Sequence, residues 1–140
     1  MEVTILDNLG ISADLLLRSL SSLFIAILFI QSGVDKVVNW KGEKEFYTSH
    51  FNKSILKGTV PLLMPVITIS ELAAGFLSGI GLIIYLAGGS PNLAFLGMLL
   101  AKLSIIQLFF GQRVAKDFAG AASLVPYFLI TVVGLYFYLS

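Results

Sequence analysis

Residues 15–34 read LLLRSLSSLFIAILFIQSGV, and Arg18 is the one charged side chain in this stretch. A helix needs about 20 mostly apolar residues to cross the hydrocarbon core of a bilayer. The apolar run ends where Asp35, Lys36 and further charged residues appear. The sequence therefore predicts a membrane-spanning helix over about residues 15–38.

The rest of the chain has a similar composition. Hydrophobic residues make up 57% of its 140 residues and charged residues 12%, against about 45–50% and about 25% in soluble domains. Lipid can cover so much apolar surface, whereas a soluble fold of this size cannot bury it. Three further spans are predicted at about residues 62–87, 93–110 and 118–139. We expect an all-α, antiparallel four-helix bundle in the membrane, forming one domain over residues 1–140.

Residues that break helices separate these spans. Pro61 and Pro65 stand at the start of the second span, where a missing N–H costs little. Residues 88–92 (GGSPN) predict a tight turn. Residues 111–113 (GQR) are expected to end the third span, and Asp117 suits the N-terminus of the fourth.

The leading segment does not resemble a signal peptide. It is acidic, with Glu2, Asp7 and Asp14, and no small-residue cleavage site follows the apolar run. Lysine and arginine concentrate in the loop after the first span and in the loop after the third. The positive-inside rule then places both termini outside the cytoplasm.

Aromatic and apolar side chains recur at roughly helical spacing in the loop between the first two spans. Charged residues fill the gaps. This pattern predicts an amphipathic helix in the membrane interface, either as an anchor or as a docking surface for a soluble partner. The aromatic and apolar positions are Trp40, Phe46, Tyr47, His50, Phe51 and Ile55.

Three ionisable residues lie within the predicted spans: Arg18, Glu71 and Lys102. Such residues are costly in lipid and often mark function. Glu71 and Lys102 each lie nine residues, or roughly 14 Å, from the cytoplasmic end of their helix. Because a tight turn joins these two helices, we expect a Glu71–Lys102 ion pair. It would either hold the bundle together or also bind a ligand or a proton.

Other polar residues are candidates for packing or binding. Arg18, near the outer face, would reach the headgroups, bond a neighbouring helix, or bind an anionic or carbonyl ligand. Tyr127 follows Pro126, which should kink the fourth span, and its hydroxyl needs either a backbone or a ligand partner. Gly75 and Gly79 are spaced for close helix packing.

The residues that the chain lacks restrict its chemistry. It has no cysteine, and its only histidine, His50, lies in a predicted loop. Disulfides, thiolate metal sites and iron–sulfur clusters are therefore excluded, and we expect no metal and no haem. The net charge of +1 gives no indication of nucleic acid. Electron transfer would need a quinone, a flavin or a partner subunit.

Several short motifs follow one another along the spans. Arg18 is followed by Gly33-Val34-Asp35-Lys36, then by Glu71-Leu72 in a span that begins with prolines. The fourth span opens with residues 116–122 (KDFAGAA), which include Asp117, and continues to Tyr127-Phe128. In their order and spacing these residues resemble the DoxX family of small four-helix bacterial membrane proteins.

This resemblance implies a location in the bacterial inner membrane and a role beside partner proteins. The family's named member is the small membrane subunit of a thiosulfate:quinone oxidoreductase. Arg18, Gly33, Lys36 and Glu71 correspond to typical polar and glycine positions of the family. The leading hypothesis is a membrane subunit of a quinone-linked oxidoreductase that depends on a partner for catalysis. The alternatives are a non-catalytic accessory or assembly subunit and, less favoured, a small transporter.

Overall fold

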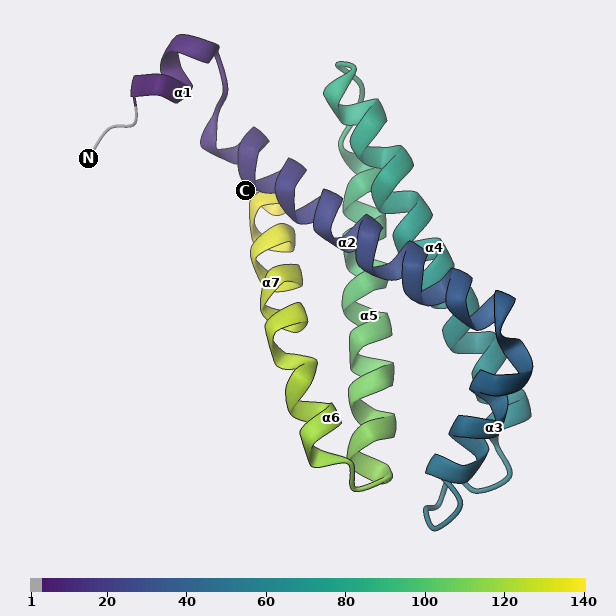
Figure 1. Cartoon of the computed structure of the whole chain (residues 1–140). Coiled ribbons are helices and arrows are strands. Elements are labelled where there is room, and N and C mark those ends of the chain that lie inside the picture. The colour runs from purple at the N-terminus through teal and green to yellow at the C-terminus, as the bar shows by residue number, and fades with distance from the viewer. Residues whose placement is uncertain (1–3) are drawn as a thin grey trace.

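The computed structural model describes residues 4–140, which are almost entirely α-helical and contain no strand (Figure 1). Four segments are long and apolar enough to cross a membrane: α2, α4, α5 and the combined α6–α7 segment. The four predicted spans are confirmed, and the chain is a multi-pass membrane protein. The helices are α1 (Thr4–Leu9), α2 (Ala13–Val38), α3 (Trp40–His50), α4 (Val60–Leu86), α5 (Asn92–Val114), α6 (Phe118–Ser123) and α7 (Val125–Leu139).

Two helix ends differ from the prediction. α5 continues through residues 111–113 and ends at Val114, a few residues beyond the predicted end at about residue 110. Glycine inside a helix costs only about 1 kcal/mol, and Gly111 packs beside the ring of Phe51. α3 ends at His50, earlier than the aromatic pattern predicts.

The fourth span is interrupted at Leu124, between α6 and α7. Proline lacks the N–H that would bond the preceding turn, and Pro126 stands two residues after Leu124. At the start of the span, the Asp117 carboxylate accepts a hydrogen bond from the Gly120 N–H at 2.9 Å and caps α6. The sequence therefore predicts both the cap and the position of the disruption.

α4 packs against both α2 and α5, and α7 packs against α2 and α5. In Figure 1, α2 runs obliquely across the other spans, and the C-terminus lies beside the first turns of α2. The buried face of α2 follows the helical period from Ser22 to Lys36. The apolar core joins α2, α4 and α5 through Ile25, Phe29, Ala74, Met98, Ala101 and Ile105.

Glycines allow α2 and α4 to approach closely. A Cβ added at Gly75 would lie 2.7 Å from the backbone nitrogen of Ile30, and one added at Gly33 would lie 2.6 Å from Cδ2 of Leu72. A Cβ added at Gly79 would lie 3.6 Å from its nearest neighbour, the Cβ of Ala26, which is an ordinary van der Waals distance. Close packing is thus confirmed at Gly75, while Gly79 has room for a methyl group.

Candidate functional site

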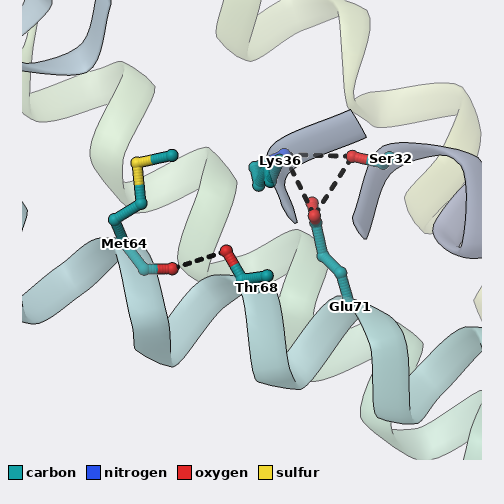
Figure 2. Close-up of polar contacts among 5 residues, drawn as sticks. All are labelled: Ser32, Lys36, Met64, Thr68 and Glu71. Carbon is teal, nitrogen blue, oxygen red and sulfur yellow. Dashed lines mark hydrogen bonds and ion pairs between the residues drawn. The ribbon is translucent and has the colours of Figure 1, made fainter. Parts of the chain in front are cut away.

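A buried polar cluster joins the end of α2 to the middle of α4. The Lys36 ammonium lies 3.0 Å from Oε2 of Glu71 and donates a hydrogen bond to the Ser32 hydroxyl at 3.1 Å. The Ser32 hydroxyl in turn donates to the same Glu71 oxygen at 3.1 Å, which closes a triangle (Figure 2). The two charged side chains are 7% and 0% exposed. Each therefore depends on the other, because an isolated charge in this setting is very costly.

The predicted ion pair between Glu71 and Lys102 is wrong. Lys36 is the partner of Glu71, and the Lys102 ammonium instead lies 3.8 Å from the centre of the Phe128 ring on α7. Counting residues gives a side chain's depth in the membrane but not the direction in which it leaves the helix axis. The face of α5 that meets α4 carries Gly97, which lies against Ser78, and Lys102 is turned toward α7.

One hydrogen-bond acceptor of the cluster has no partner among the described residues. Oε1 of Glu71 is buried and has no hydrogen-bond partner within residues 4–140. One turn away on α4, the Thr68 hydroxyl donates to the Met64 carbonyl at 2.7 Å and is therefore already occupied (Figure 2). A buried carboxylate oxygen without a partner is costly, so this atom is where a further hydrogen bond or a proton would be most favourable.

Tyr47 connects this cluster to a neighbouring cavity. Its ring centre on α3 lies 6.0 Å from the Lys36 ammonium. Burial raises the pKa of the Tyr47 hydroxyl above its usual value, and the nearby Lys36 charge only partly opposes this. The hydroxyl is therefore protonated at neutral pH and is available as a hydrogen-bond donor.

The cavity has a volume of about 260 Å³ and lies between α3, the loop after it, α4 and α5. Tyr47 and two glutamine side chains provide its polar lining, and the remaining walls are aromatic and aliphatic. The sequence indicates Gln107 only as an uncommon polar residue in a span, because a cavity shared by three elements has no local signal. The lining residues are Tyr47, Phe51, Leu56, Val60, Leu63, Met64, Val66, Ile67, Gln107, Leu108, Phe110, Gly111 and Gln112.

At the other end of the bundle, Arg18 binds the last turn of α7 and the end of α4. Its Nε donates to the Phe137 carbonyl at 2.6 Å, and its two terminal nitrogens reach the Tyr85 hydroxyl and the Ser140 carbonyl at 3.2 Å each. The guanidinium also lies over the Tyr138 ring, 5.6 Å from its centre. Of the predicted roles for Arg18, the structure shows a hydrogen bond to neighbouring helices.

Replacing Arg18 by lysine is expected to loosen α7 almost as much as replacing it by methionine. A lysine ammonium is a point charge and cannot reproduce a planar fork that bonds three separate acceptors. We expect either variant to lower the melting temperature in detergent by several degrees and to increase cleavage by carboxypeptidase at the C-terminus. Arg113→Lys, on the far end of α5, is the matched control. Equal melting of Arg18→Lys and the wild type would contradict this role.

The remaining predicted residues have structural neighbours. Tyr127 packs against Phe24, with ring centres 6.1 Å apart, and no hydrogen bond involves its hydroxyl among residues 4–140. Asp117, besides capping α6, lies 3.7 Å from Nε2 of His50. The same histidine nitrogen is 2.8 Å from the Gln112 side-chain oxygen. Together these contacts join the end of α3 to the last turn of α5 and to the loop that follows it.

Fold and site together define a class: an all-α, multi-pass membrane protein with an ion pair buried between two spans and an apolar cavity beside it. The described residues contain no group of three or more histidine, cysteine, aspartate or glutamate side chains that could hold a metal ion. No protein-family model matches the chain, and no curated protein or solved structure matches it either.

Proposed function

We propose that this chain is a DoxX-like membrane subunit that binds a quinone in the cavity between α3, α4 and α5 and acts with partner proteins in redox metabolism. The observation that carries the proposal is the cavity itself. It is apolar, it opens among membrane helices, and Tyr47 brings it within reach of a buried charge pair. Ligand pockets usually combine apolar walls with a few well-placed polar groups.

The lining suits the chemistry of a quinone. A quinone headgroup is a flat apolar ring with two carbonyl acceptors, and its isoprenoid tail is soluble in lipid. Phe51 and Met64 would contact the ring, while the Tyr47 hydroxyl and the Gln107 amide would donate to the carbonyls. When bound, a quinone supplies two-electron redox capacity that the side chains of this chain lack. At about 260 Å³, the cavity is somewhat smaller than the usual range of ligand pockets, about 300–1,000 Å³. This size favours entry of the headgroup, with the tail remaining between helices.

The proposal includes a topology. The spans would run antiparallel, with both termini outside the cytoplasm of a bacterial inner membrane. α3, which carries four lysine and glutamate residues beside its aromatic side chains, would lie in the cytoplasmic interface. The cavity would then open near the cytoplasmic surface, where a soluble redox partner could approach.

Filling the cavity should abolish quinone binding. We expect Gly111→Leu to reduce labelling by a photoreactive short-chain ubiquinone analogue about tenfold or more, because the new side chain occupies the site. Tyr47→Phe, which removes only a hydrogen-bond donor, should weaken binding several-fold. The measurement is photolabelling of the full chain in nanodiscs, with peptide mapping and competition by unlabelled quinone.

Two controls separate the cavity from general partitioning into lipid. Tyr136→Phe changes an exposed residue on α7 and should label as the wild type does. Labelled peptides should come from α3, α4 and the last turns of α5. Labelling that is unaffected by Gly111→Leu, or that maps evenly over all spans, would refute the quinone site.

The second candidate is a non-catalytic accessory or assembly subunit. The satisfied bonds of Arg18 and the closed Ser32–Lys36–Glu71 triangle favour it, because both clusters stabilise the bundle without any ligand. Purification from native membranes in mild detergent distinguishes the two candidates. Stoichiometric quinone in the preparation supports the first, and a larger assembly without quinone supports the second.

A further inference from the structure

Lys102 is a charged side chain near the middle of α5 that has no hydrogen-bond or ion-pair partner among the residues that the structure describes. It lies ten residues after Asn92 and twelve before Val114, or roughly 15 and 18 Å from the two ends of the helix. Both distances exceed the reach of an extended lysine, so the ammonium cannot snorkel to either surface. Among residues 4–140 its one polar contact is the face of the Phe128 ring at 3.8 Å. No hydrogen bond or ion pair within the described chain reaches it.

A groove begins one turn from Lys102. It has a volume of about 320 Å³, lies between α5 and the interrupted α6–α7 span, and is lined only by apolar side chains. Phe128 belongs both to the groove and to the contact with Lys102. The lining residues Ile106, Phe109 and Val125 are 40–47% exposed. A half-buried cation and an open apolar groove therefore share one outward face.

We propose that this face binds a transmembrane helix of another protein, and that this helix carries an aspartate or glutamate at the depth of Lys102. A lone cation at mid-membrane is costly and finds its most favourable neighbour in a carboxylate. The apolar groove would hold that helix so that its carboxylate lies beside Lys102. This inference rests on one part of the proposed function, namely that the chain acts with a partner subunit. It adds which surface of this chain binds the partner and which acidic group the partner presents.

A second copy of this chain does not supply the required acid. Its spanning helices contain three acidic residues. Asp14 and Asp35 lie near the two ends of α2, and Glu71 is fully buried against Lys36. A symmetric dimer through this face would also bring two Lys102 ammonium groups together. The partner must therefore be a different chain.

Site-specific photocrosslinking in native membranes tests this directly. A benzoylphenylalanine placed at Ile106 in the groove of the full chain should form an adduct with a protein that has a carboxylate within a membrane span. The same probe at Ile27, a 61% exposed position on α2, is the matched control and should not capture that protein. Lys102→Met should reduce the Ile106 adduct about tenfold or more, and Lys102→Arg should retain it.

Charge exchange completes the test. Lys102→Glu should abolish the adduct, and changing the partner's intramembrane acid to lysine should restore it. The proposal is overturned if the Ile106 adduct survives Lys102→Met, joins only two copies of this chain, or captures a protein without an intramembrane acid. It is also overturned if Lys102→Met lowers the melting temperature of the isolated chain by more than a few degrees, since Lys102 would then stabilise its own fold.

The quinone assay keeps the two proposals separate. The quinone analogue should label the Lys102→Met variant as strongly as it labels the wild type, because Lys102 does not line the cavity between α3, α4 and α5. Lost labelling in Gly111→Leu would not alter the Ile106 adduct. Absent labelling in the wild type with an intact adduct would refute the quinone site and leave the docking surface standing.

Discussion

Replacing either member of the Lys36–Glu71 pair alone is expected to destabilise the protein more than any other single change of charge. Lys36→Met would leave a fully buried carboxylate without a cation, and Glu71→Leu would leave a 7%-exposed ammonium without an anion. Breaking such a pair on one side costs about 3–5 kcal/mol, which corresponds to a fall in melting temperature on the order of 10 °C for a chain of this size. Thermal unfolding in one detergent, followed by circular dichroism, measures it.

The double variant Lys36→Met with Glu71→Leu is the informative control. Two apolar side chains of similar volume need no desolvation of charge, so most of the lost stability should return. A double variant whose loss of stability equals the sum of the two single losses would show that the side chains act separately. The double variant also tests the role of the pair, because unchanged labelling by the quinone analogue would make the pair structural, and lost labelling would assign it to the ligand site.

Adding one methyl group at Gly75, in the variant Gly75→Ala, should cause the second largest loss of stability. The new Cβ would lie 2.7 Å from the backbone nitrogen of Ile30, so α2 and α4 would have to separate. Such separation would also stretch the 3.0 Å contact between Lys36 and Glu71, which joins the same two helices. Overpacking of this kind costs about 1–3 kcal/mol and sometimes more. We expect Gly75→Ala to lower the melting temperature clearly and Gly75→Leu to prevent accumulation of folded protein in the membrane.

Gly79→Ala provides the comparison on the same helix and toward the same neighbour. Its Cβ would meet Ala26 at 3.6 Å, an ordinary contact, and replacing glycine by alanine favours the helix by about 1 kcal/mol. Gly79→Ala should therefore be neutral or slightly stabilising. Equal destabilisation at both positions would mean that α2 and α4 do not meet as the structure shows.

Hydropathy determined the number and approximate position of the spans, because the bilayer imposes a length and an apolar composition on each one separately. Local sequence was equally informative at Asp117, whose carboxylate caps α6, and at Pro126, which lies two residues after the interruption of the fourth span. The buried positions of α2 from Ser22 to Lys36 likewise recur at the period of a helix. Each of these features depends on residues that are neighbours along the chain.

The partners of the intramembrane charges were decided only by tertiary structure. The sequence gives the depth of Glu71 and Lys102, but the rotation of each helix about its axis depends on which glycines allow which backbones to meet. That rotation brings Lys36 to Glu71 and turns Lys102 toward Phe128. Arg18 bonds two backbone carbonyls near the C-terminus, and carbonyls are present at every residue, so no sequence pattern marks them. The cavity is likewise shared by three elements and exists only once α3 has packed beside α4 and α5.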